Sequence, residues 1–203
     1  ALPHDSGRRR PQDFLPQDVR NLLPGLNAEL QGLVTLRSAH PGDDGSERLL
    51  VDLADGQTVE SVLLPRDGLC VSTQVGCAVG CVFCMTGKDG LLRQVSSAEI
   101  VAQVALARTR RPVKKVVFMG MGEPAHNLDN VMEAIDTLGT VGAIGHKSLV
   151  FSSVGDPRAF ERLPQGPVKP ALALSLHTSR ADLRARLLPK APRLSPEELV
   201  ELG

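Results

Sequence analysis

Apolar and polar residues alternate one by one in an early part of the chain, which is the pattern of strands with one buried face. The stretches SERLLVDL and QTVESVLLP show this pattern most clearly, and they flank Ala54–Gly56. An Asp-Gly pair between apolar runs is a strong signal for a tight hairpin turn. We therefore expect residues 33–68 to form a β-hairpin appendage. Residues 1–32 show weak periodicity and several prolines, so we expect a short helical or irregular accessory arm there.

After residue 68, short apolar runs alternate with helical patterns. The candidate strands are LCVST, KKVVFM, KSLVFSS and ALALSL. Between them, Ser96–Glu99 has the sequence of a capping box that opens a helix. A second helix is indicated by apolar residues at helical spacing, namely Leu128, Val131, Ile135 and Leu138. Repeated β-then-α units predict parallel strands covered by helices, as an open sheet or a (β/α) barrel, with the chemistry at the carboxyl ends of the strands.

The end of the sequence changes this picture in one respect. Ser195–Glu198 is a well-formed helix start, yet the sequence ends at Gly203, barely two turns later. Four strands also do not close a barrel. We therefore expect an α/β fold in which residues 69–203 form a partial (β/α) barrel, incomplete at its C-terminus, and we expect the chain to be part of a longer protein.

Composition and charge exclude several classes of protein. With 203 residues, 42% of them hydrophobic, the chain can bury one good-sized core. No apolar run approaches the ~18 residues of a membrane helix and no secretory signal is present, so we expect a cytoplasmic protein with no membrane partner. The net charge is zero. Two local basic patches are interpreted as solvated helix faces rather than RNA-binding surfaces, one with Arg108, Arg110, Arg111, Lys114 and Lys115, the other with Arg180, Arg184, Arg186, Lys190 and Arg193.

The stretch GCAVGCVFCMTG carries the strongest chemical signal. It holds Cys77, Cys81 and Cys84, whereas Cys70 stands seven positions earlier. Three clustered thiolates are one fewer than a closed structural metal site uses, so a bound group keeps an open position. Sulfur ligands favour an iron-sulfur cluster or zinc. Gly76 and Gly80 let the backbone fold tightly, and we interpret the loop as an iron-sulfur site. The alternatives are a zinc site completed by Cys70, or buried thiols without a ligand.

The wider sequence resembles a known family. CAVGCVFC, with an aromatic residue before its last cysteine, resembles the cluster motif of radical S-adenosylmethionine (radical SAM) enzymes. LCVSTQVGCAVGCVFCMTGKDG, VVFMGMGEPAHNLDNV, ALSLHTSRADLRARLLP and the upstream VESVLLP resemble the adenine-C2 RNA methyltransferases of the RlmN/Cfr family, over about residues 45–193. The resemblance implies a barrel of the radical SAM type. It also implies a 4Fe-4S cluster on the three clustered cysteines, whose open iron binds S-adenosylmethionine and cleaves it to a 5'-deoxyadenosyl radical.

Further site residues lie at the ends of the predicted strands. Gly120–Glu123 follows KKVVFM, where glycines allow close approach of the backbone and a carboxylate could accept from a ligand ammonium. By resemblance, Gly122 and Glu123 hold the methionine amine of the cofactor. The resemblance also assigns cofactor contacts to residues after the third and fourth strands, namely Ser152, Ser175, Leu176 and His177.

Two residues outside these motifs have implied catalytic roles. By resemblance, Cys70 helps to break a covalent enzyme-RNA intermediate, for which an exposed thiolate is the competent species, and Glu60 accepts a proton. From the residues alone, Cys70 is a small buried hydrophobe and Glu60 is an outward-facing hairpin charge. The methyl-carrying cysteine of the family has no counterpart here, because no cysteine follows Cys84.

The resemblance implies an RNA substrate, 23S ribosomal RNA and in some members transfer RNA, with an electron donor such as flavodoxin or ferredoxin. Two other functions compete with this interpretation. One is a radical SAM enzyme that abstracts hydrogen from a different substrate without methyl transfer. The other is a zinc-binding RNA-interaction module that uses all four cysteines.

Overall fold

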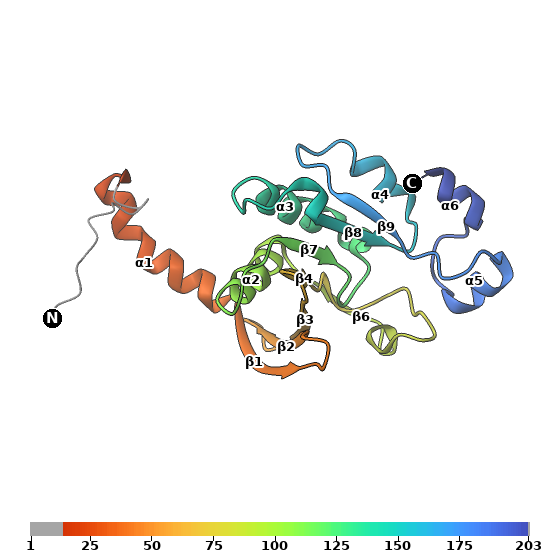
Figure 1. Ribbon diagram of the computed structural model, residues 1–203, viewed down its shortest axis with the longest axis horizontal. Helices are drawn as coiled ribbons and strands as arrows, with labels where there is room; N and C mark the ends of the chain where they lie inside the picture. Colours follow the sequence, from red (N-terminus) through yellow and green to blue (C-terminus); the bar gives the residue numbers. More distant parts are fainter. Residues whose placement is uncertain (1–13, 203) are drawn as a thin grey trace.

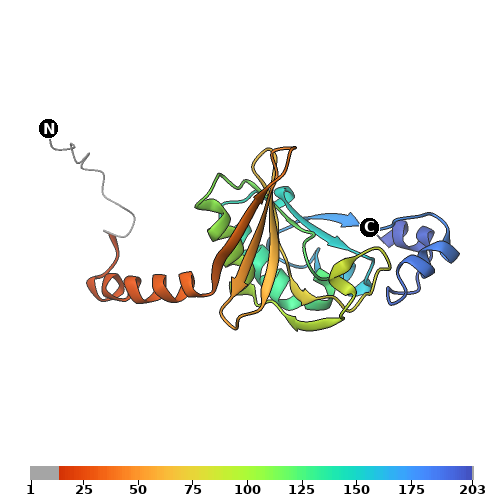
Figure 2. The ribbon, with the colours of Figure 1, turned by 90° about the horizontal axis from the view of Figure 1, so that it is seen from below.

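The computed structural model describes residues 14–202. Its first helix, α1 (Gln17–Gly32), projects away from the rest of the molecule (Figures 1 and 2). The helix buries none of its residues, and apolar side chains at helical spacing such as Leu22 and Leu26 are exposed at 70% and 51%. The arm predicted at residues 1–32 is therefore helical in this part. Residues 1–13 of the arm lie outside the described residues.

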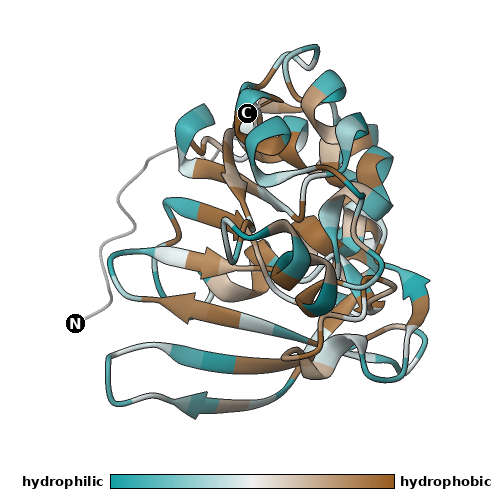
Figure 3. Cartoon of the chain, turned by 90° about the vertical axis from the view of Figure 1, so that its right-hand side faces the viewer, coloured by the Kyte–Doolittle hydropathy of each residue, from teal (hydrophilic) through white to brown (hydrophobic). Residues whose placement is uncertain are grey.

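The predicted hairpin is present as part of a three-stranded antiparallel meander. Strands β2 (Glu47–Leu53) and β3 (Thr58–Leu64) are joined by the turn at Ala54–Gly56, as the sequence predicts. Strand β1 (Val34–Pro41) pairs with the other side of β2. Alternate side chains of β2 and β3 are buried, while the hairpin loops are hydrophilic (Figure 3).

The four predicted parallel strands are all confirmed. They are β4 (Gly68–Cys70), β7 (Lys115–Phe118), β8 (Leu149–Ser153) and β9 (Ala171–Leu174). Strand β4 also pairs with β3 in antiparallel fashion, so one seven-stranded sheet runs in the order β1-β2-β3-β4-β7-β8-β9. The α/β partial barrel is confirmed. The hairpin extends the same sheet, and the predicted division of the chain into three domains stays a prediction.

Helices follow the parallel strands along the chain. The α-helices after α1 are α2 (Ser97–Arg108), α3 (Leu128–Gly139), α4 (Pro157–Arg162), α5 (Ala181–Leu187) and α6 (Pro196–Leu202). Short 3-10 turns occupy Met85–Gly87, Pro124–Asn127 and His146–Ser148. A separate two-stranded ribbon of β5 (Gln74–Gly76) and β6 (Leu91–Gln94) was not predicted. Among residues 14–202, no helix is long and apolar enough to span a lipid bilayer.

The helix starts form where the sequence places them. Ser96 Oγ accepts a hydrogen bond from Glu99 N at 3.2 Å, and the Glu99 carboxylate accepts one from Ser96 N at 2.8 Å, which completes the capping box of α2. Ser195 and Glu198 make the same pair of bonds before α6. Both helix starts are therefore determined by local side-chain-to-backbone hydrogen bonds.

One glutamine attaches α2 to the chain that leads into the cysteine loop. Gln103 is 1% exposed, and its Oε1 accepts from Ser72 N at 3.0 Å and from Ser61 Oγ at 2.9 Å. Its Nε2 donates to Ser72 O at 3.0 Å. The side chain thus pairs both backbone groups of Ser72, directly after β4 and before β5, and fixes how the loop leaves the sheet.

Replacing Gln103 by Met keeps the volume but leaves three buried polar groups without a partner, each at a cost of about 1–3 kcal/mol. We expect Gln103→Met to lower the free energy of unfolding by about 3 kcal/mol or more, measured by urea denaturation of the apoprotein. Gln165→Met, at an exposed position, is the control and should change it by less than about 0.5 kcal/mol. Equal stability of the two variants would contradict the role of Gln103.

Candidate metal and cofactor site

A pocket of about 280 Å³ lies where the carboxyl ends of β7, β8 and β9 meet the cysteine loop. Most of the predicted site residues line it, namely Cys77, Cys81, Cys84, Gly122, Glu123, Ser152, Ser175 and His177. Residues that the sequence did not single out also contribute, among them Thr86, Met119 and Val154. Leu176, Cys70 and Glu60 are not in the lining. The fold therefore gathers residues spread over about 100 positions into one place.

The cysteine loop begins where β5 ends and is shaped by two glycines. Gly76 and Gly80 have φ of +77° and +65°, a conformation that disfavours other residues. A Cβ on Gly76 would stand 2.1 Å from Gly90 O, so only glycine fits there. The tight turn that the sequence predicts is confirmed, and Cys84 N donates to Cys81 O at 3.0 Å across its tip.

The three thiols differ in exposure but affect one another electrostatically. Cys77 is buried, Cys81 is half-buried and Cys84 is exposed. Burial raises the pKa of Cys77 and, with smaller contributions from the neighbouring thiols of Cys77 and Cys84, raises the pKa of Cys81 to about 11. Cys77 and Cys81 are therefore protonated at neutral pH, and a metal cluster must displace their protons on binding.

The donor set fits a cluster held by three thiolates. Soft sulfur donors from one short loop face a single pocket, and carboxyl and hydroxyl groups stand opposite them. Within residues 14–202, no three His, Cys, Asp or Glu side chains already have the geometry to hold a metal ion. The three thiols nevertheless line one pocket, on one short loop.

Glu123 is the most enclosed charged group of the pocket. It is 4% exposed, its Oε1 accepts from Ala125 N at 3.1 Å and its Oε2 accepts from Val154 N at 3.0 Å. Burial raises its pKa, and among the described residues it forms no ion pair. Hydrogen bonds from the Val154 and Ala125 backbone and from the Ser153 side chain act against that rise. A ligand ammonium in the pocket would supply the missing positive charge.

Ser152, Ser175 and His177 form the part of the pocket wall that comes from the ends of β8 and β9. Ser152 Oγ and Ser175 Oγ are 3.2 Å apart, joining the ends of β8 and β9. The His177 ring lies 4.9 Å from the Phe83 ring, centroid to centroid, so the strand end contacts the cysteine loop. His177 has φ of +64°, a strained conformation that a surrounding structure must impose. The predicted cofactor roles of these residues, and of Leu176, stay predictions.

Cys70 and Glu60 lie on adjacent strands behind the pocket wall. Cys70 pairs with Val62 across β4 and β3, and Glu60 is two residues from Val62, so both side chains point to the same face of the sheet. Such diagonal neighbours are on the order of 7–8 Å apart. Glu60 is partly exposed and forms a 3.5 Å ion pair with Arg48. The pair is thus close together but outside the pocket lining.

Cys70 is not the exposed thiolate that its implied role calls for. The side chain is partly enclosed, and burial raises its pKa to about 11, with the Met119 backbone acting weakly in the opposite direction. At neutral pH the thiol is therefore protonated. Met119 also lines the pocket, so Cys70 is one residue away from it. Its catalytic role, like that of Glu60, stays a prediction.

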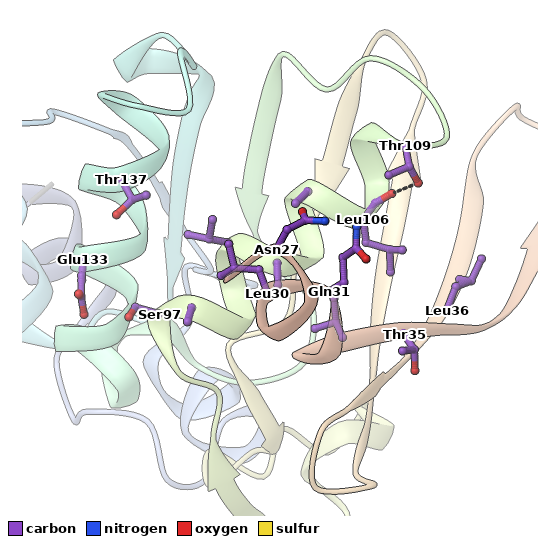
Figure 4. A pocket seen from close by; sticks show the side chains of 15 residues that line it. Asn27, Leu30, Gln31, Thr35, Leu36, Ser97, Leu106, Thr109, Glu133 and Thr137 are labelled. Carbon is purple, nitrogen blue, oxygen red and sulfur yellow. Dashed lines mark hydrogen bonds between the residues drawn. The ribbon is translucent and has the colours of Figure 1, made fainter. Parts of the chain in front are cut away.

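A larger cavity lies elsewhere and does not fit the chemistry. It measures about 800 Å³ and lies between the end of α1, β1 and the outer sides of α2 and α3 (Figure 4). Leu30, Val101 and Leu106 are typical of its lining, in which the described chain places no cysteine or histidine. Size therefore favours this cavity, but the convergence of ligating groups identifies the smaller pocket as the site.

One further side chain, Gln74, supports the site. It is fully buried, and its Oε1 accepts from Glu123 N at 2.8 Å while its Nε2 donates to Gln94 Oε1 at 2.8 Å. The β5–β6 ribbon is thereby attached to the turn after β7. No motif distinguishes this glutamine in the sequence; only the pairing of the ribbon reveals it.

Two of the five residues of the first basic patch form ion pairs. Arg110 binds Glu47 and Lys114 binds Asp67 at 2.5 Å and 2.8 Å, and Arg108 donates to Gly142 O at 2.8 Å. These contacts support the interpretation as a solvated face, except at Arg111, whose Nε and Nη2 are buried and have no hydrogen-bond partner in the described part of the chain.

The second basic patch contains one exception. Arg180 and Arg186 are exposed and both bind Asp182, but Arg184 is 4% exposed. For Arg184 the interpretation as a solvated charge is wrong, because α5 turns this residue toward the cysteine loop.

The fold and the pocket agree with the similarity of the chain to known proteins. The family model of the Radical SAM superfamily matches residues 71–202. The chain therefore belongs to the radical SAM superfamily, and the resemblance predicted from the cysteine motif is confirmed. The cofactors of that family are a 4Fe-4S cluster and S-adenosylmethionine.

Curated relatives and a solved structure are similar over nearly the whole chain. A protein of Leptothrix cholodnii named "Probable RNA methyltransferase" is 80% identical over 99% of this chain and 58% of its own length. One of the same name from Dechloromonas aromatica is 72% identical over 100% and 57%. The crystal structure of a radical SAM methyltransferase from Sphaerobacter thermophilus has a TM-score of 0.77 at 34% identity, over 93% and 58%. The chain thus spans less than two thirds of these proteins.

Gly122 offers a direct test of the pocket wall. Its φ is +102°, and an added Cβ would stand 2.6 Å from Gln74 Cβ, displacing the side chain that supports Glu123. We expect Gly122→Ala to lower the free energy of unfolding by about 3 kcal/mol, combining strain and overpacking. Gly56→Ala, with φ of +83° and nothing within 4 Å, isolates the strain and should cost about 1 kcal/mol in the same urea denaturation. Equal costs would refute the steric argument.

Proposed function

We propose that this chain carries the cofactor site of a radical SAM RNA methyltransferase. The observation that carries the proposal is the pocket itself, in which three thiols of one loop face a buried carboxylate that lacks a cationic partner. The names of the relatives in Leptothrix cholodnii and Dechloromonas aromatica support RNA as the substrate class. The structural neighbour from Sphaerobacter thermophilus supports methyl transfer as the reaction class.

Different residues of the pocket bind the two cofactors. Cys77, Cys81 and Cys84 would hold the cluster, and the cluster would supply the electron for cleavage of S-adenosylmethionine. Glu123 accepts hydrogen bonds from the ammonium of the methionine part, which neutralises its buried charge. The Gly122 backbone permits close approach to that group. Ser152, Ser175, Leu176 and His177 then orient the remainder of S-adenosylmethionine.

The finer proposal is methylation of C2 of an adenine in 23S ribosomal RNA, with transfer RNA as a second substrate. It rests on the resemblance to the RlmN/Cfr family over about residues 45–193. Cys70 and Glu60, close together on β4 and β3, would assist release of the RNA and removal of a proton.

The mouth of the pocket presents side chains suited to an unstacked base. Phe83 lines the pocket, is 55% exposed and lies next to the ring of the exposed His177. Aromatic side chains of this kind stack on nucleobases, and a base must leave its helix to present C2 to a pocket. An electron donor such as flavodoxin or ferredoxin and a cytoplasmic location belong to the same proposal.

Substitution of single cysteines tests the cluster. We expect Cys77→Ala, Cys81→Ala and Cys84→Ala each to abolish the brown colour and most of the bound iron and sulfide after anaerobic reconstitution, because three thiolates are the minimum donor set. Cys70→Ala is the matched control and should retain iron and sulfide near four per chain. A colourless wild-type protein with one zinc, lost in Cys70→Ala, would instead favour the zinc-binding module.

The RNA assignment is tested in cells. We expect a deletion strain to lose 2-methyladenine from 23S ribosomal RNA, measured by mass spectrometry of nuclease digests, and the intact gene to restore it. A Glu123→Ala gene should fail to restore it, because the buried carboxylate is needed to bind the methionine ammonium. Unchanged 2-methyladenine in the deletion strain would overturn the ribosomal assignment, and cleavage of S-adenosylmethionine without RNA methylation would favour the other radical SAM reaction.

A further inference from the structure

Helix α5 packs against the back of the cysteine loop. A small hydrophobic cluster joins the two, in which Cys77 and Val79 of the loop contact Val154 and Leu188, with Cys81 packed against them. Val82 N also donates a hydrogen bond of 3.0 Å to Leu187 O at the end of α5. The position of the loop therefore depends on α5 and on the residue after β8.

Arg184 lies inside this contact. The side chain is 4% exposed, and its Nη2 donates to Val154 O. Its Nε is buried and has no hydrogen-bond partner, and within residues 14–202 the guanidinium forms no ion pair with a carboxylate. This is an unusual environment for arginine, which is rarely buried without a paired anion.

A buried cation of this kind needs a compensating charge. Removing a charged group from water costs several kcal/mol unless an anion lies close by. Burial lowers the pKa of Arg184, and the one ionisable group that acts in the opposite direction is the Cys81 thiol. With a cluster bound, Cys81 would be a thiolate, and the three thiolates together would give the cluster and its ligands a net negative charge. Such a group would be the anion that the buried guanidinium lacks.

We propose that Arg184 is a positioning residue for the 4Fe-4S cluster, whose Nε donates a hydrogen bond to the sulfur of Cys81 and whose charge stabilises the reduced cluster. The proposal rests on the proposed cluster site and assigns it a partner outside the cysteine motif. Hydrogen bonds and positive charge near cluster sulfurs raise the reduction potential. Arg184 would therefore make reduction of the cluster more favourable.

The same residue links the cluster to the cofactor side of the pocket. Val154 O accepts from Arg184, and Val154 N donates to Glu123 Oε2 at 3.0 Å. A single residue, Val154, thus separates the Arg184 guanidinium on the cluster side from the Glu123 carboxyl group on the cofactor side. Both groups are fixed by the end of β8, so the cluster loop and the proposed ammonium site keep a constant relative position.

A redox titration of the reconstituted holoprotein, monitored by electron paramagnetic resonance, measures the reduction potential and tests the proposal. We expect Arg184→Gln to shift the reduction equilibrium at least tenfold toward the oxidised cluster, or about 59 mV for one electron. Arg184→Lys keeps the charge but has no donor at the Nε position, and we expect a shift of at least threefold. Arg186→Gln removes a charge from the exposed face of the same helix and should leave the potential unchanged.

A second measurement covers the case in which a variant folds poorly. The rise in the thermal unfolding midpoint on loading reports the coupling between Arg184 and the cluster, independent of the stability of the apoprotein. We expect this rise to be smaller in Arg184→Lys than in the wild type and Arg186→Gln. A wild-type potential and a wild-type rise in Arg184→Lys would overturn the proposal. Loss of the cluster from wild type and every variant alike would overturn the proposed cluster site instead.

Discussion

The ends of β7 and β8 are held together by one buried carboxylate, that of Glu123. Its two oxygens accept backbone hydrogen bonds from Ala125 in the turn after β7 and from Val154 after β8. Parallel strands end at the same edge of a sheet, but their following turns diverge unless something ties them. Because Gln74 in turn holds Glu123 N, the tie extends to the ribbon from which the cysteine loop starts. The walls of the pocket therefore depend on this group.

This arrangement has an energetic cost. Glu123 is a buried carboxyl group whose pKa burial raises, Arg184 is a buried guanidinium, and neither forms an ion pair among the described residues. Each is desolvated without full compensation, which costs free energy. Binding of a cationic ammonium at one and an anionic cluster at the other would relieve both costs. A site of this kind gives up some folding stability in exchange for groups that are held in place for their ligands.

The sequence predicts those features that depend on local patterns. The four parallel strands, the capping boxes at Ser96 and Ser195, and the tight turn at Gly76 all follow from residue types at fixed spacing. The membership in the radical SAM superfamily also follows from one short loop. The β5–β6 ribbon could not be predicted, because its strands of three and four residues carry too little periodicity. The antiparallel pairing of β3 with β4, which makes the hairpin part of the main sheet, is a tight hairpin across residues 65–67, but β4 has only three residues and carries too little alternation to predict the pairing.

The burial of isolated polar residues follows from no local sequence pattern. Gln74, Gln103 and Arg184 are all buried, yet in the sequence each resembles a surface residue. Arg184 stands among four other basic residues, and helical spacing alone does not say which of them faces inward. The hydrophobic residues around it decide the matter: Leu187 and Leu188 pack on the cysteine loop, and Arg184 lies one turn earlier on the same side of α5. A charged residue one helical turn from the apolar contact of a short helix can therefore be buried, and a buried charge needs a partner of opposite sign. For Arg184 the thiolates of the cysteine loop would be that partner.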